Sequence, residues 1–136
     1  MGSISQVPPV DGRSINDYGK AFDFLRSARD ERFYIILVRN DMTLYDPYMH
    51  TYGQPDSVRV DMTTLTQYID VFAERGFVVL HNHPPPSQAI PSKADIRLTM
   101  NLVKIGKSLG KPLFNHCIVS EKEDRYFSDL FPEVLV

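Results

Sequence analysis

The stretch that decides the fold is Phe-Val-Val-Leu-His-Asn-His-Pro, residues 77–84. Its first four residues are apolar and partly β-branched, which is typical of a strand buried on both faces of a sheet. Residues two apart in a strand point to the same side, so His81 and His83 face one way and Asn82 faces the other. The sequence therefore predicts a buried strand with two imidazoles together at its carboxyl end.

A carboxylate follows on the next predicted element. A proline-rich loop leads to Ser92-Lys93-Ala94-Asp95, which opens a periodic apolar run and predicts the first turn of a helix. Two imidazoles and one carboxylate are typical ligands of a catalytic zinc ion, which keeps a further position for water. We predict that His81, His83 and Asp95 bind Zn²⁺, and that Ser92 can donate a hydrogen bond to an oxyanion beside them.

Ser92 and Asp95 also have a structural explanation. Ser-x-x-Asp ahead of an apolar run is a capping box, which needs no metal, and both roles can coexist in the same two residues. A single strand histidine is usually a hydrogen-bonded structural residue. Two histidines on one strand face, directly before a loop and a helix start, favour a metal site.

The composition is that of one ordinary globular domain. The chain has 136 residues and a formal net charge of −2, which gives no overall electrostatic case for binding nucleic acid or an anionic membrane. The single cysteine, Cys117, excludes an internal disulfide and fits a reducing compartment. No apolar run approaches the length of a membrane span and no signal peptide opens the chain, so we expect a cytoplasmic protein.

Hydrophobic periodicity divides the rest of the chain into alternating elements. Residues 1–13 are predicted to form an extended arm and residues 14–136 a single domain. The predicted helices cover about 15–28, 62–75 and 93–109, and the predicted strands cover about 33–38, 42–50, 58–60, 77–83, 113–119 and 125–128. This order predicts an α/β domain with a central mixed sheet and helices on its faces.

The sequence also predicts where one of these helices begins and ends, and where several side chains lie. The helix at about 62–75 is expected to start at Asp61, to turn Phe72 inward and to end at Gly76. His116 and Cys117 are adjacent in a strand and point oppositely, so His116 is expected to be structural or to lie behind the ligands.

Residues 93–111 carry five basic side chains and one acidic side chain. A solvated helix face is the favoured explanation of these charges, and a small patch for nucleic acid or an acidic partner is the alternative.

The motif His-x-His-Pro at 81–84 with Pro-Ser-x-x-Asp at 91–95 resembles the signature of the JAB/MPN (JAMM) zinc metalloproteases, closest to their RadC-like branch. The similarity extends over roughly residues 15–130 and includes Glu31-Arg32-Phe33 and Tyr126-Phe127-Ser128. Other metal-site patterns are missing from the sequence, because it has neither His-Glu-x-x-His nor Pro-Cys-x-x-Cys.

The resemblance implies a three-layer α/β/α fold of the cytidine-deaminase-like kind. It implies His81, His83 and Asp95 as zinc ligands and Ser92 as the residue that stabilises the oxyanion. It also implies hydrolysis of peptide or isopeptide bonds, with ubiquitin-like conjugates as substrates of relatives. A DNA-repair association is attached to the RadC-like branch by its name.

The sequence departs from the family pattern where a catalytic glutamate is expected. That position, five residues before Gly53, holds Tyr48, and no glutamate occurs between residues 33 and 72. Asp46 or His50, expected on the same strand face as Tyr48, can substitute as the base, and Glu31 can reach the site only under a different alignment register.

Two hypotheses follow from this departure. The first, slightly favoured, is a metallopeptidase that is weak because it lacks this glutamate, with Asp46 as its base. The second is an inactive metal-binding domain that recognises a protein or DNA partner. Proton transfer by a general base contributes about 10²–10⁴-fold to the rate of hydrolysis. The rate of hydrolysis would therefore distinguish the two hypotheses.

Overall fold

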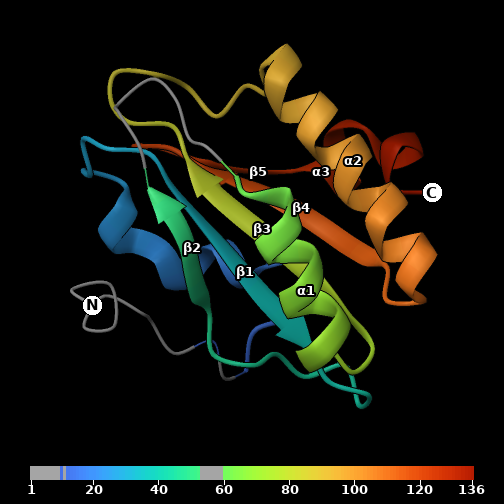
Figure 1. Ribbon diagram of the computed structural model, residues 1–136. Helices are drawn as coiled ribbons and strands as arrows, with labels where there is room; N and C mark the ends of the chain where they lie inside the picture. The colour runs from blue at the N-terminus through green and yellow to red at the C-terminus, as the bar shows by residue number, and fades with distance from the viewer. Residues whose placement is uncertain (1–9, 11, 53–59) are drawn as a thin grey trace.

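The computed structural model describes residues 10, 12–52 and 60–136, and a five-stranded sheet runs through them. The strand β3 (Gly76–Asn82) lies at the centre of the sheet (Figure 1). It is buried along its whole length, as its apolar run predicts. β1 (Arg32–Val38) pairs with it antiparallel on one side, and β4 (Leu113–Val119) pairs with it parallel on the other. β2 (Tyr48–Tyr52) and β5 (Asp124–Tyr126) lie outside these, each antiparallel to its neighbour. The sheet is mixed, as predicted.

Helices cover both faces of the sheet and complete the predicted three layers. α1 (Met62–Phe72) and α2 (Lys93–Leu109) pack on the face that carries Phe33, and they lie in front of the sheet in Figure 1. The 3₁₀ helix η2 (Tyr18–Leu25) packs on the opposite face, where the Tyr18 hydroxyl donates to the backbone oxygen of Val79 at 2.6 Å. The predicted α/β/α architecture is confirmed.

The connection from β3 to β4 positions the site. Two parallel neighbouring strands need a crossover, and α2 supplies it. A crossover helix begins at the end of the sheet where the preceding strand ends, so the first turn of α2 lies beside the last residues of β3. The helix starts after the N-cap Ser92 and ends at Gly110, whose φ of 70° lies in the left-handed region that glycine adopts freely. Both ends are those that the sequence predicted.

The strand predicted at 42–50 is wrong in its first half. Regular pairing with β1 begins at Tyr48, and before it only Leu44 forms an isolated bridge, with Val38. Pro47 explains the late start, because proline has no N–H to donate to a neighbouring strand. Asp46 therefore lies in an irregular segment rather than on the strand face that it was predicted to share.

The end of α1 also differs from the prediction. The helix stops at Phe72 and is capped by Ala73, whereas Gly76 is the first residue of β3. A side chain at Gly76 would place its Cβ 2.4 Å from the backbone oxygen of Pro112, so this glycine permits close approach of two chain segments. Phe72 is 60% exposed rather than turned inward.

The remaining differences lie near the two ends of the chain. A short 3₁₀ helix replaces most of the helix predicted at 15–28. The strand predicted at 125–128 is β5 followed directly by the short helix α3 (Phe127–Leu130), after which η3 (Pro132–Leu135) ends the chain. Most of the predicted arm at 1–13, most of the strand predicted at 58–60, and Gly53 lie outside the described residues.

Candidate metal centre

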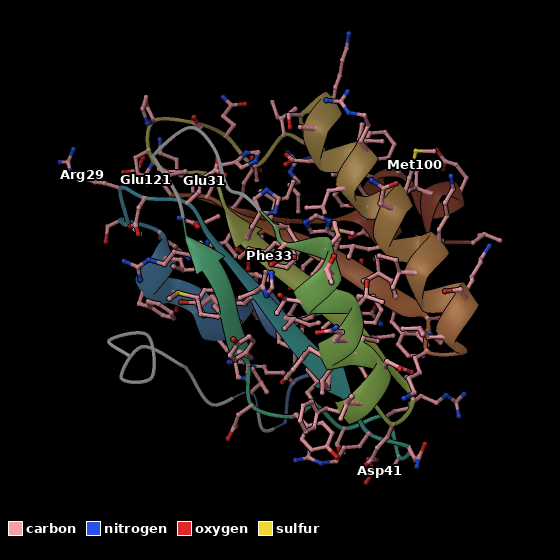
Figure 2. All side chains as sticks on the ribbon, viewed as in Figure 1. Arg29, Glu31, Phe33, Asp41, Met100 and Glu121 are labelled. Atoms are coloured by element: carbon pink, nitrogen blue, oxygen red, sulfur yellow. The ribbon has the colours of Figure 1, made fainter. Side chains whose placement is uncertain are left out.

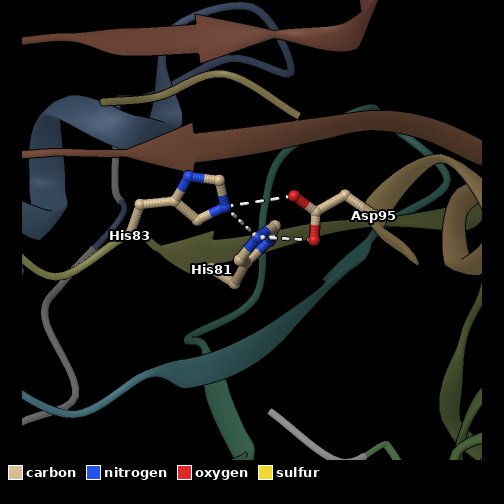
Figure 3. A group of neighbouring side chains, drawn as sticks. All are labelled: His81, His83 and Asp95. Carbon is tan, nitrogen blue, oxygen red and sulfur yellow. Dashed lines mark hydrogen bonds and ion pairs between the residues drawn. The ribbon is translucent and has the colours of Figure 1, made fainter. Parts of the chain in front are cut away.

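The three predicted ligands converge at the carboxyl end of β3 (Figure 3). His81 Nε2 lies 3.2 Å from His83 Nε2 and 3.2 Å from Asp95 Oδ1. His83 Nε2 lies 3.0 Å from Asp95 Oδ2. His81 is fully buried and the other two side chains are largely buried, so a strand end and a helix start together form a small, partly desolvated cluster.

The spacing of these atoms fits a tetrahedral metal ion. Two ligands bound to Zn²⁺ at about 2.0–2.1 Å in a tetrahedron are about 3.3–3.4 Å apart. The three observed distances of 3.0–3.2 Å are slightly shorter than this edge. Residues His81, His83 and Asp95 therefore form a group that could bind a metal ion with small movements of their side chains.

The hydrogen bonds behind His83 fix which of its nitrogens carries a proton. Nδ1 of His83 lies 2.8 Å from the backbone oxygen of Gln88, and a carbonyl oxygen can only accept. Nδ1 is therefore the donor, and in the neutral ring Nε2 carries a lone pair toward the cluster. A backbone carbonyl behind a histidine ligand is a recurring way to orient it toward a metal.

A longer chain of hydrogen bonds fixes the proton of His81 in the same way. The Thr99 hydroxyl donates to the backbone oxygen of Asp95 at 2.8 Å, so its oxygen accepts from Nδ1 of His116 at 2.7 Å. Nε2 of the neutral His116 ring then accepts from Nδ1 of His81 at 2.8 Å. His81 is left with an unprotonated Nε2 that points at Asp95. This Nε2 is the atom that a metal would use.

His116 is neutral in this series of hydrogen bonds because it is completely buried, and burial lowers the pKa of His116 well below its ordinary value. Its place behind His81 agrees with the expectation that it lies behind the ligands, and Cys117 lies in the core on the opposite face. Thr99 was missed from the sequence. The available signal was its spacing, because residues four apart on a helix share a face and Asp95 is four residues earlier.

The capping box of α2 holds the carboxylate in place. The backbone N–H of Ser92 donates to Asp95 Oδ2 at 2.9 Å, and the backbone N–H of Asp95 donates to Ser92 Oγ at 3.0 Å. The Ser92 oxygen acts as an acceptor in this bond, so its own hydroxyl proton stays available for another partner. The structural role predicted for these two residues is present and is compatible with a role in the site.

The charges of the cluster depend on one another. Burial tends to raise the pKa of Asp95, but the close contacts of this carboxylate with His81 and His83 and the hydrogen bond from the Ser92 N–H lower its pKa far below the ordinary range. Burial tends to lower the pKa of His83, but the Asp95 carboxylate and the Gln88 carbonyl raise it on balance, with a further contribution from Glu31. The carboxylate thus favours a positive charge beside it, which a proton or a metal ion can supply.

Asp46 is not brought to this cluster. Tyr45, the residue before it, donates its backbone N–H to the oxygen of Leu37, and Leu37 pairs with Phe77 near the start of β3. His81 is four strand positions further along, and Asp46 itself is exposed. The expectation that Asp46 lies on the site face depended on a longer second strand, which Pro47 prevents.

His50 is closer but already has a partner. It is the extra residue of a β-bulge opposite Phe33, the strand neighbour of His81, and its ring lies 6.2 Å from that of Phe33. Its Nε2 accepts the backbone N–H of Asp61 at 3.2 Å. Burial lowers the pKa of His50, with the nearby Asp61 charge opposing this.

Glu31 lies at the level of His83. Phe33 pairs with His81, and the backbone N–H of Arg32 donates to Oδ1 of Asn82 at 2.8 Å. The same antiparallel register carries Glu31, which is labelled in Figure 2 and lies immediately before β1, to the level of His83. The Glu31 charge helps to raise the pKa of His83. Among the candidates Asp46, His50 and Glu31, only Glu31 thus combines a carboxylate with a position beside a ligand.

A hollow of about 530 Å³ lies next to the segment that supports His83. It is lined by residues 86–88 on one side and by residues 120–123 with Arg125 on the other. Its lining includes Gln88, whose carbonyl accepts from His83.

Comparison with known proteins agrees with this geometry. Residues 14–130, nearly the whole chain, match the family of RadC-like JAB domains. The chain belongs to this family. Its mixed sheet between helices is that of an α/β JAB/MPN fold, and the RadC-like JAB domain places its His-His-Asp group at the end of β3.

This RadC-like JAB domain is similar to several UPF0758 proteins. The one from Aquifex aeolicus is 31% identical over 118 residues, which cover 85% of this chain and 50% of the relative. The one from Alteromonas mediterranea is 28% identical over 104 residues, which cover 76% of this chain and 46% of the relative. The chain spans about half the length of the curated relatives it matches. Among its described residues, no helix has the length and apolar character needed to cross a membrane.

Proposed function

We propose that this RadC-like JAB domain is a zinc-dependent hydrolase of peptide or isopeptide bonds. The observation that carries the proposal is the direction of the three ligand atoms. In the neutral rings, hydrogen bonds behind His81 and His83 leave both Nε2 atoms unprotonated, and both face the carboxylate of Asp95. Three electron-pair donors packed within bonding reach of one point favour a bound cation.

The chain's own residues supply the other parts that amide hydrolysis needs. A bound Zn²⁺ would supply a nucleophile near neutral pH and polarise the scissile carbonyl. The Glu31 carboxylate, beside His83, accepts the proton of the attacking water and passes it to the leaving amine. The Ser92 hydroxyl, whose oxygen accepts from the Asp95 N–H, donates a hydrogen bond to the developing oxyanion.

Metal content and turnover test the proposal separately. We expect purified protein to bind one zinc ion per chain, and His83→Ala to lose both metal and activity. Glu31→Gln should keep the metal and lower turnover of a generic fluorogenic peptide or a ubiquitin-like fusion by about 10²–10⁴-fold.

Glu74→Gln is the matched control for Glu31→Gln. Glu74 accepts from the backbone N–H of Asn40, which follows the end of β1 away from the cluster. This variant should retain full turnover. A zinc-loaded wild-type protein that hydrolyses no faster than Glu31→Gln would contradict the hydrolase proposal and support the alternative of an inactive metal-binding domain.

A further inference from the structure

The two proposed ligands His81 and Asp95 are joined behind the site by a continuous path of hydrogen bonds. The path runs from the backbone oxygen of Asp95 to the Thr99 hydroxyl, then to His116 and then to His81. It links α2, β4 and β3, which are the three elements of the crossover. Thr99 and His116 are both fully buried, so no bulk solvent competes for these bonds.

We propose that Thr99 and His116 are positioning residues that hold His81 in the tautomer with its proton on Nδ1. The metal-binding part of this inference rests on the proposed function, whereas the tautomer is a property of the protein without metal.

Thr99 decides which group donates and which accepts at each hydrogen bond of the path. Its hydroxyl has one proton, and the Asp95 carbonyl can only accept, so the donor at that end is fixed. Each ring along the path must then donate through Nδ1, as far as His81. Without the hydroxyl, His116 can carry its proton on either nitrogen. A proton on its Nε2 would force His81 to accept through Nδ1 and to place its own proton on Nε2, toward the cluster.

Packing fixes the ring of His116 independently of this proton. Its ring stacks on that of Phe127 with centroids 4.6 Å apart and an angle of 8° between the planes. The stacking holds the ring plane but does not distinguish the two tautomers. The roles therefore separate, because Phe127 holds the ring in place and Thr99 sets the direction of its hydrogen bonds.

The test is the Thr99→Val variant, which keeps the shape of the side chain and removes the hydroxyl. Nitrogen-15 NMR of histidine rings, in metal-free protein at about pH 8, reports which nitrogen carries the proton. Wild-type His81 should show a proton on Nδ1, and Thr99→Val should show a mixture of tautomers at His81 and His116. Zinc affinity, measured by competition with a chelator, should fall by about 10–100-fold.

Two further variants distinguish the direction of the hydrogen bonds from a general effect of replacing a helix threonine. Thr99→Ser restores the hydroxyl and should restore both the tautomer and the zinc affinity. Thr66→Val is the matched control, because the Thr66 hydroxyl makes the same bond to a carbonyl four residues earlier, that of Met62, on α1. It should alter neither quantity.

The outcomes are distinct. A wild-type His81 with its proton on Nε2, or a Thr99→Val protein with an unchanged His81 tautomer, overturns the proposal. A wild-type protein that shows the expected tautomer but binds no zinc contradicts the proposed function and leaves the positioning role supported. A Thr99→Val protein whose zinc affinity falls while its tautomers stay fixed assigns Thr99 a merely structural role and overturns the proposal.

Discussion

At the scale of single residues, the site is defined by where its protons are. His81 and His83 each give the Nδ1 proton to an acceptor behind them, so both present bare nitrogens 3.2 Å apart. In the absence of a metal, the Asp95 carboxylate favours a proton on His83 instead. A bound metal ion would therefore compete with a proton for the same electron pairs.

The raised pKa of His83 predicts that the stability of the metal-free protein depends on pH. The pKa of His83 is raised, so its stabilising contribution is complete below about 6.5, its unfolded value, and is lost as pH rises through the folded pKa. The pKa of His116 is lowered by burial, so His116 destabilises the fold below the same pH. The difference in unfolding free energy between wild type and His83→Ala should therefore shrink as pH rises from 6 to 9.

Urea unfolding at several pH values measures this difference. A chelator must be present so that trace metal does not occupy the site. A difference that grows with pH would show that His83 is not stabilised as a cation, and would contradict the ion pair with Asp95.

The three ligands were predictable from the sequence because strand and helix periodicities place side chains without knowledge of the tertiary fold. Alternation placed His81 and His83 on one side, and the capping box placed Asp95 in the first turn of α2. Glu31 was named only as a candidate under a different alignment register, because its place beside His83 depends on the pairing of two strands that are distant in the sequence. The register of these strands is set by pairing, such as Phe33 with His81, which no local pattern reveals.

At the scale of elements, the start of α2 serves the helix and the site together. Ser92 caps the helix, and the same contact holds the backbone of Asp95 at the end of β3. The sequence predicted both ends of α2 because Ser92 and Gly110 act locally. It failed at Gly76, which looks like a helix cap but is required by the nearby Pro112, and at Tyr48, where Pro47 delays the strand.

The double role of Ser92 predicts two effects of Ser92→Ala. Loss of the cap should lower the unfolding free energy by about 1 kcal/mol. Zinc affinity should also fall, because the lost Oγ contact no longer fixes the backbone of Asp95 in the first turn. Chemical denaturation and zinc competition measure the two effects.

Asp61→Ala is the matched control for that prediction. Asp61 caps α1 by accepting from the backbone N–H groups of Thr63 and Thr64, and it is not a ligand. It should lose a similar amount of stability and keep its zinc affinity. Equal zinc affinities in the two alanine variants would refute the idea that the cap of α2 organises the site.

At the scale of the whole molecule, the site joins β3 to α2 across the proline-rich connection. Metal bound only by the folded state stabilises it by RT ln(1 + [L]/Kd), which is about 2.7 kcal/mol at 100 times Kd. We expect zinc at that excess to raise the unfolding free energy of wild type by about this amount and to leave His83→Ala unchanged. Calorimetry or urea titration checks it, and an equal rise in both proteins would place the metal elsewhere.

The carbonyl of Gln88 has a consequence for inhibitor design. It accepts from Nδ1 of His83, and Gln88 also lines the hollow formed by residues 86–88, 120–123 and Arg125. If the proposed zinc ion is bound, a compound that enters this hollow and shifts Gln88 should remove the hydrogen bond that orients His83, and so weaken zinc binding without chelating the ion. Selectivity among metal-binding proteins would then come from the residues that line the hollow, which are not proposed as metal ligands or catalytic residues.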